Sequence, residues 1–151
     1  MPCNELQGYV SKGDQYLNKR GISTGIRKMN KKDHESVVTG VLTAILAEFF
    51  RSEDGYLIRA EHVANKGFTD LLVLHYDKND KESQFLVVQC KRLSKEASNA
   101  TWNEAKNQLK RYLPGLKQQD KQCPVFGVIA IGRYIQFVEY DHKLAEGSMA
   151  L

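Results

Sequence analysis

The stretch GFTDLLVLHYDKNDKESQFLVVQCKR, residues 67 to 92, decides the fold, because it predicts two apolar strands joined by a polar turn. Asp70 stands at the head of the first apolar run, and Gln89 and Lys91 stand at the tail of the second. In an antiparallel hairpin the start of one strand lies beside the end of the next. These polar side chains are therefore either ordinary solvated strand ends or the members of one site.

Side-chain alternation along the second strand separates two kinds of position. Gln89 and Lys91 are two residues apart, so both point to one face of the sheet, whereas Cys90 points to the opposite, apolar face. Cys90 is therefore expected to be a small core residue and not a nucleophile. Its backbone carbonyl remains free to act as an additional metal ligand.

Hydrophobic periodicity predicts the elements around this hairpin. A broad apolar stripe indicates a largely buried helix that begins at Asp33, its expected N-cap, and stops at residues 52–55. The expected elements, in chain order, are helix 33–51, strands 56–63, 68–76 and 84–91, helix 101–113, and strands 124–132 and 134–141. This order is αβββαβ with one extra strand at the end, an α/β domain.

Composition limits the class of protein. The chain has 151 residues, 42% of them apolar, which suits one domain with a sizeable core. It shows no apolar run long enough to span a bilayer and no secretory signal layout. The spacing of its three cysteines matches no zinc site, so reduced thiols and an intracellular location, cytoplasm or nucleus, are expected.

Charge is unevenly distributed along the chain. The net charge is +4, yet residues 1–32 alone contain seven Lys or Arg and only two acidic residues. We therefore divide the chain into a basic N-terminal arm or extension, residues 1–32, and a domain, residues 33–151. Such an arm suits a polyanion such as nucleic acid, although a solvated, flexible terminus has the same composition.

The polar residues at the hairpin ends match the needs of phosphodiester hydrolysis. A divalent cation must neutralise the phosphate and activate a water, and a positive group must stand near the reacting atoms. Mg²⁺ prefers oxygen ligands and keeps several waters, so one or two carboxylates and the substrate phosphate suffice. Asp70, Gln89 and Lys91 supply these types of group.

The segments FTDLLVL and FLVVQCKR resemble the motif of the PD-(D/E)XK nuclease superfamily, which has the restriction-endonuclease-like fold. Thr69-Asp70 stands where the family has Pro-Asp, and Gln89-Cys90-Lys91 stands where it has acid-x-Lys. The Q-x-K variant is similar to Mrr-type nucleases. The resemblance covers residues 33–141 and implies a central mixed sheet flanked by helices.

The resemblance also implies a third metal ligand and a substrate-binding helix. A glutamate of the first helix often reaches the metal; Glu35 is our first candidate, Glu48 the reserve, and Glu61 in the first strand a third. The pair Gln108 and Tyr112 resembles the Q-x-x-x-Y element of RecB-type nucleases, and positions i and i+4 share a helix face. The expected phosphate contacts are Lys106, Lys110, Arg111 and Arg92.

Two nucleic-acid functions remain open at this stage, beside a third, less favoured alternative: an α/β protein that does not act on nucleic acid and whose hairpin ends are polar by chance. The first is a Mg²⁺- or Mn²⁺-dependent nuclease, favoured as an endonuclease on DNA over RNA, in which Asp70, Gln89 and Glu35 hold the metal and Lys91 orients the attacking water. The second is a degenerate member that binds nucleic acid or serves as an effector or targeting domain without cleavage. A homodimer and a place within a larger multidomain protein are compatible with either function, and no membrane partner is expected.

Overall fold

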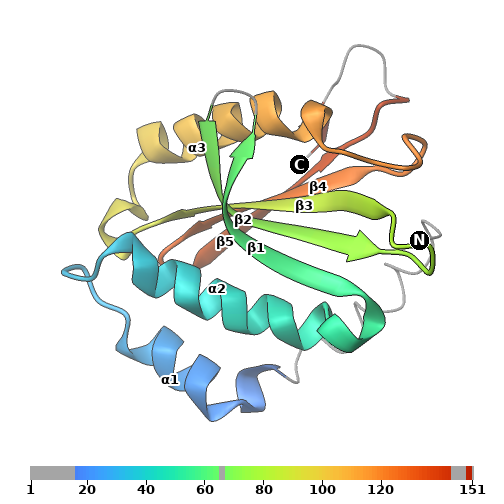
Figure 1. Ribbon diagram of the computed structural model, residues 1–151. Helices are drawn as coiled ribbons and strands as arrows, with labels where there is room; N and C mark the ends of the chain where they lie inside the picture. The colour runs from blue at the N-terminus through green and yellow to red at the C-terminus, as the bar shows by residue number, and fades with distance from the viewer. Residues whose placement is uncertain (1–15, 65–66, 144–148, 151) are drawn as a thin grey trace.

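The structure is a computed structural model that describes residues 16–64, 67–143 and 149–150. Its centre is a six-stranded sheet in which the strands lie in sequence order, β1-β2-β3-β4-β5-β6. Helix α3 covers one face of this sheet, α2 covers the other, and α1 lies outside α2 (Figure 1). The predicted α/β class is confirmed.

The bounds of the regular elements agree closely with the expected ones. The strands are β1 (Tyr56–Ala64), β2 (Gly67–Tyr76), β3 (Glu82–Lys91), β4 (Val125–Ile131), β5 (Tyr134–Tyr140) and β6 (Met149–Ala150). The helices are α1 (Arg20–Lys28), α2 (Glu35–Phe49) and α3 (Asn99–Tyr112). Neither α1 nor β6 was anticipated: the apolar residues Ile22 and Ile26 of α1 and Met29 at its C-cap have helical spacing but stand in a polar, glycine-containing segment, and β6 has only two residues.

Strand pairing makes the sheet mixed, as predicted. Strands β1, β2 and β3 form an antiparallel meander, whereas β3 and β4 are parallel and are connected through α3. Strand β5 pairs antiparallel with β4 and with β6. The sheet is therefore the αβββαβ core with its extra strands added on the β4 side.

Two hydrophobic clusters hold the helices on the sheet. The cluster on the α2 side includes Val38, Leu42, Val88 and Cys90, and that on the α3 side includes Val87 and Leu109, among others. The middle strands β2 and β3 are buried on both faces, which explains their nearly continuous apolar sequence. We call the two faces of the sheet the α2 face and the α3 face.

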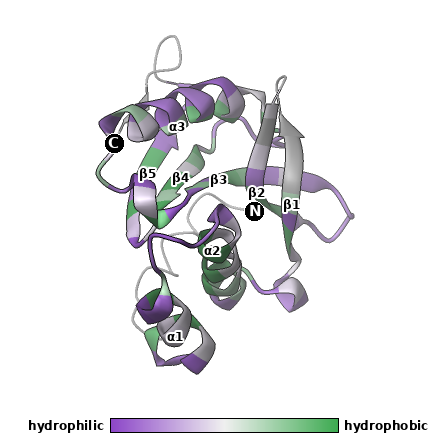
Figure 2. Cartoon of the chain, turned by 90° about the vertical axis from the view of Figure 1, so that its left-hand side faces the viewer, coloured by the Kyte–Doolittle hydropathy of each residue, from purple (hydrophilic) through white to green (hydrophobic). Residues whose placement is uncertain are grey.

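The strands β2 and β3 separate at one end. Their paired register begins at Leu71↔Val88, while the preceding residues of β2 continue to pair with β1. Asp70 therefore stands at the point where the two strands diverge, which we call the fork. The fork lies at the end of the sheet where β3 and β4 finish and α2 begins, the end that faces the viewer in Figure 2.

Two local predictions were wrong. The N-cap of α2 is His34, not Asp33, and it makes no side-chain capping bond. Asp33 instead accepts hydrogen bonds from the backbone and the side chain of Asn30, which close the turn before the helix. Cys123 is disulfide-bonded, contrary to the expectation of reduced thiols, whereas Cys90 is a buried free cysteine.

The described part of the N-terminal segment packs on the domain. Ile22 and Met29 are each 4% exposed, and Met29 belongs to the cluster under α2. Arg133, in the β4–β5 turn, donates from Nε to the Ile26 carbonyl at 2.8 Å and from Nη2 to the carbonyls of Arg27 and Met29. These bonds hold the end of α1 against the sheet near the fork.

No helix among the described residues is both long and apolar enough to cross a membrane.

Replacing Arg133 should release the end of α1. In Arg133→Ala we expect faster amide hydrogen exchange in residues 22–29 and a melting temperature lower by a few degrees, because three carbonyls lose their donor. Arg133→Lys should show nearly the same increase in exchange and the same loss of melting temperature, since a lysine lacks the planar guanidinium that donates several hydrogen bonds at once. Lys121→Ala, which removes an exposed positive charge elsewhere, is the control. Unchanged exchange in residues 22–29 would contradict this role for Arg133.

Candidate active site

A hydrogen bond across the fork places Asp70 next to the end of β3. The backbone N–H of Cys90 donates to Asp70 Oδ2 at 2.7 Å, although the two residues are twenty positions apart in the sequence. Backbone donors to a carboxylate favour its charged form. Asp70 therefore lies next to the Gln89–Lys91 segment, as predicted, and it contacts the backbone of that segment.

Glu35 comes to the same place from α2. It lies in the first turn of that helix, and its carboxyl interacts electrostatically with Asp70, Lys91 and Arg92. Burial raises the pKa of Glu35 above 4.5 and the negative charge of Asp70 adds to this, while Lys91 and Arg92 lower it. Charge repulsion between two half-buried carboxylates is the arrangement that a bound cation relieves.

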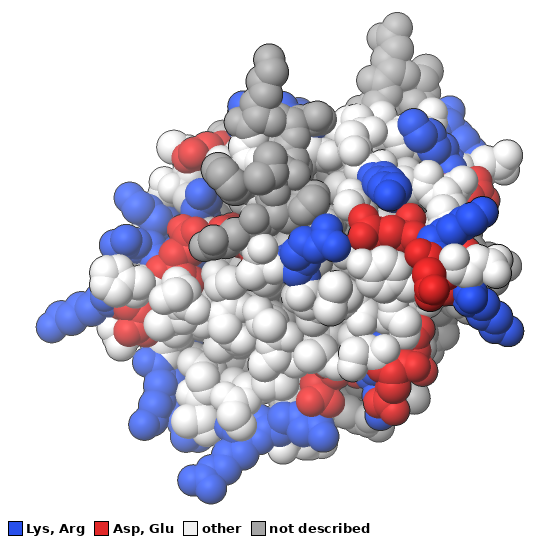
Figure 3. Space-filling model, viewed as in Figure 1, with Lys and Arg blue, Asp and Glu red and all other residues white. Residues whose placement is uncertain are grey.

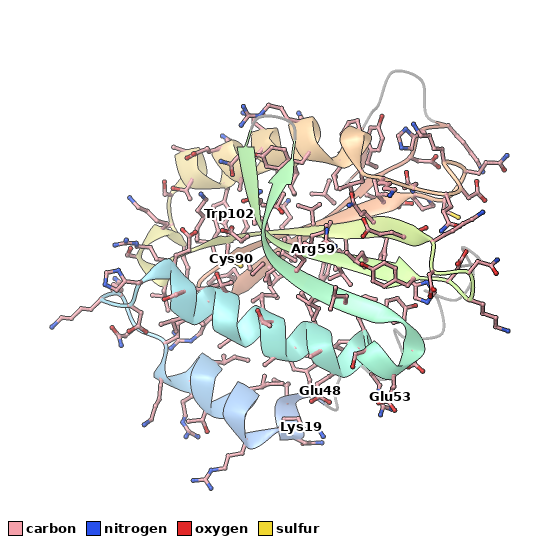
Figure 4. All side chains as sticks on the ribbon, in the orientation of Figure 1. Lys19, Glu48, Glu53, Arg59, Cys90 and Trp102 are labelled. Atoms are coloured by element: carbon pink, nitrogen blue, oxygen red, sulfur yellow. The ribbon has the colours of Figure 1, made fainter. Side chains whose placement is uncertain are left out.

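The first reserve candidate, Glu48, is far from the site. Glu48 lies at the other end of α2 from the fork, where it forms an exposed ion pair with Lys19 at 3.8 Å (Figure 4). The side chain of Glu61 lies outside the described residues. Of Glu35 and Glu48, the structure brings Glu35 to Asp70.

Cys90 lies behind the site. Its side chain is fully buried in the cluster on the α2 face, as side-chain alternation predicts. The pKa of its thiol is raised to about 12, chiefly by burial; a hydrogen bond with Thr39 lowers it, the charges of Asp70 and Glu35 raise it, and Lys91 lowers it. The thiol is therefore protonated at neutral pH and is not a nucleophile.

The side chain of Gln89 points to the α3 face of the sheet, into the protein interior. It alternates with Cys90 and shares its face with Val87, which belongs to the cluster under α3. Gln89 is only 2% exposed, and its amide Nε2 is buried with no hydrogen-bond partner in the described part of the chain. A buried donor in this state costs roughly 1–3 kcal/mol, so an acceptor oxygen, such as that of a bound water or phosphate, would suit it.

The residues predicted to contact nucleic acid have mixed positions. Lys91 and Lys106 are half-buried, whereas Arg92, Lys110 and Arg111 are exposed. Arg111 stacks over the ring of Tyr112, its neighbour, with 5.8 Å between the guanidinium carbon and the ring centroid. The electrostatic interactions of Glu35 place Lys91 and Arg92 beside it.

Gln108 and Tyr112 both face inward from α3. Tyr112 is 3% exposed, and its hydroxyl fills the space where a side chain at Gly67 would begin. Tyr112 therefore packs against Gly67 at the start of β2, three residues before Asp70. A larger residue at position 67 would collide with the Tyr112 hydroxyl. The amide Oε1 of Gln108 is buried and has no partner among the described residues.

The donor set at the fork fits a hard cation better than zinc. Within the described residues no group of three or more His, Cys, Asp or Glu side chains is placed to hold a metal. Two carboxylates, those of Glu35 and Asp70, approach each other there. Mg²⁺ is bound by one or two carboxylates and waters, so this set suits it.

Sequence reasoning missed two residues near this end of the sheet. Arg133 and Glu96 meet where the β4–β5 turn passes the segment after β3, and the backbone N–H of Arg133 donates to Glu96 Oε1 at 2.8 Å. The N–H of Gly132 in turn donates to the Lys91 carbonyl. No sequence signal indicates these contacts, because they join residues about forty positions apart.

Comparison with known proteins gives one result. A family model of the PD-(D/E)XK nuclease superfamily matches residues 33–139. No curated protein and no solved structure matches the chain significantly. The matched residues run from the start of α2 to the end of β5, so they include Glu35, Asp70, Gln89 and Lys91. Because this match covers well over half of the sequence, the chain belongs to the PD-(D/E)XK nuclease superfamily.

Proposed function

We propose that this protein is a metal-dependent nuclease that hydrolyses phosphodiester bonds in DNA, with the fork as its active site. The observation that carries the proposal is the convergence of Glu35 and Asp70, with Lys91, around the Cys90 backbone. Two mutually repelling carboxylates beside a lysine have little structural use, since their repulsion opposes folding. They match the needs of metal-assisted hydrolysis.

The oxygen ligands of the metal would come from three elements. Asp70 at the fork and Glu35 on α2 would supply carboxylates, and β3 would supply the Gln89 amide oxygen and the Cys90 carbonyl. When Mg²⁺ or Mn²⁺ is bound, it supplies positive charge to the phosphate and lowers the pKa of a water. A neutral Gln89 contributes a dipole without a formal charge, so this set leaves more net positive charge than three carboxylates would.

Lys91 is the group we place nearest to the attacking water. Its ammonium can hold that water by a hydrogen bond and stabilise negative charge that develops on the phosphate oxygens. Lys91 is close enough to Glu35 for its positive charge to lower the pKa of that carboxyl. The flanking Arg92 is exposed and can contact a neighbouring phosphate.

The basic segment that precedes α2 gives the fork a cationic border. Arg27, Lys28, Lys31 and Lys32 are exposed there. Arg133 holds the carbonyls of Arg27 and Met29 against the β4–β5 turn. Lys and Arg side chains project from this edge of the molecule, at the left in Figure 3, with acidic groups between them. Such a border favours a polyanionic substrate.

A binding module without cleavage is the alternative, and one observation favours it. Gln89 replaces an acid of the family motif, and its buried Nε2 has no partner within the described residues. Calorimetry with Mg²⁺ or Mn²⁺ separates the two functions. The nuclease binds the metal in a manner that requires Asp70, whereas the binding module does not bind it.

Two substitutions test the nuclease activity. Asp70→Asn keeps an oxygen that can accept the Cys90 N–H bond but removes a charged ligand, and Lys91→Ala removes the ammonium. Each should lower Mg²⁺-dependent cleavage of plasmid or linear DNA at least about a hundredfold, since one positioned charge stabilises such transition states by several kcal/mol.

The matched control is Lys78→Ala, an exposed lysine in the turn between β2 and β3, far from the fork. It should cleave as the unmodified protein does, and EDTA should stop cleavage by both. If Asp70→Asn and Lys91→Ala are folded and still cleave at the normal rate, the fork is not the active site.

Glu35 predicts how metal binding depends on pH. Its pKa is raised above 4.5, so as pH falls it takes up a proton sooner than an ordinary glutamate, and metal affinity should fall over the same range. Glu35→Gln should bind metal more weakly and with less pH dependence. Calorimetric titration with Mn²⁺ at several pH values measures both effects.

The same substitution has a second consequence for stability. A carboxyl with a raised pKa binds more protons in the folded than in the unfolded state, so stability is lost as pH rises through that pKa. Without metal, Glu35→Gln should therefore be more stable than the unmodified protein at neutral pH, and Mg²⁺ should stabilise it less. Glu48→Gln, on the same helix, should show neither effect; equal behaviour of the two variants would contradict the role of Glu35.

A further inference from the structure

An open groove lies on the α3 face of the sheet, beside the first residues of β5. Its volume is about 680 Å³, and it is lined by Glu96, Ala97, Trp102, Tyr134, Ile135 and Gln136. Tyr134 is 64% exposed although it is an aromatic residue in a strand. The indole N–H of Trp102 donates to the Glu96 carbonyl at 2.8 Å, which fixes the position of the second ring. Neither the metal site nor the chemistry of cleavage uses these rings.

Strand register relates the groove to the fork. Lys91 pairs with Ile131, which pairs with Tyr134, and the row two positions before it joins Gln89 to Gln136 through Ile129. Ile131 belongs to the cluster under α3, so the side chains of its row lie on the α3 face. Tyr134 is therefore two strand spacings, about 10 Å, from Lys91 on the same face of the sheet.

The chemistry of the groove selects among occupants. Aromatic faces stack on nucleobases of any sequence, and a base can reach them only when it is unpaired. Gln136 and Glu96 offer hydrogen-bonding groups, and the Glu96 carboxylate is partly satisfied by the Arg133 N–H. The exposed Arg92 and Lys95 lie in the segment between Lys91 and Glu96, where they can contact the backbone phosphates of the same strand.

We propose that the groove binds an unpaired nucleobase next to the scissile phosphate, so that the preferred substrate is single-stranded or locally unpaired nucleic acid. This inference rests on the proposed function for the position of the scissile phosphate. The base stacks on Tyr134 and lies near Trp102, while the phosphate it carries points toward Lys91. Fully paired DNA cannot fill the groove without unstacking a base, which disfavours it.

Trp102 is the chain's only tryptophan and reports directly on the groove. The experiment measures its fluorescence in the full-length protein, with EDTA to prevent cleavage, during titration with a short oligothymidylate or with a blunt duplex of equal length. The single strand should quench the fluorescence and bind more tightly than the duplex. Tyr134→Ala should weaken single-strand binding about tenfold, the loss expected for one stacked base, and Tyr134→Phe should restore it.

The matched control is Phe137→Ala. Phe137 lies on the same strand, is 70% exposed and points to the opposite face, so its loss should change nothing. Equal binding by Tyr134→Ala and the unmodified protein, an equal loss in Phe137→Ala, or no preference for the single strand would each overturn the proposal.

The cleavage assay is read separately from this binding assay. If the protein cleaves DNA but Tyr134→Ala does not weaken single-strand binding, only the proposed base-binding role of the groove is refuted. Groove-dependent binding without metal-dependent cleavage would refute the nuclease activity and leave the base site in place.

Discussion

The hydrogen bond from the Cys90 N–H to Asp70 Oδ2 is the interaction on which the site depends. The ladder between β2 and β3 begins only at Leu71↔Val88, so the carboxylate of Asp70 joins the two strands beyond the last paired residues. A hydrogen bond to a charged group contributes roughly 1.5–3 kcal/mol. It also fixes the position of one carboxylate oxygen. The same contact thus closes the fork and orients the Asp70 side chain.

The buried surroundings of this hydrogen bond strengthen the charge interactions at the fork. Cys90 and the apolar cluster on the α2 face exclude water from one side of the fork, which strengthens charge interactions there. Glu35 enters from the start of α2, and burial together with Asp70 raises its pKa. The folded protein therefore keeps two carboxylates close together at a cost in stability. Strain of this kind is typical of functional sites and is relieved when a cation binds.

Sequence patterns predicted the fold well because each core element has a clear period. The apolar runs of β2 and β3 and the stripe of α2 gave the element order, and the hairpin geometry brought Asp70 to the end of β3. Glu35 came from family resemblance, and only the structure separated it from Glu48. The contacts of Arg133 were not predictable, since the guanidinium binds backbone carbonyls that any sequence provides. The groove at Tyr134 likewise depends on strand register across β3, β4 and β5.

The most direct test of the account is a map of paramagnetic broadening by Mn²⁺ in the NMR spectrum of the isotope-labelled protein. We predict that Mn²⁺ first broadens the backbone amides of Glu35, Asp70 and Cys90 and the side-chain amide of Gln89, and leaves Tyr140 unaffected. Broadening of the fork without the Gln89 side chain would remove Gln89 from the ligand set. Broadening centred elsewhere, or none at all, would contradict the claim that the fork is a metal site.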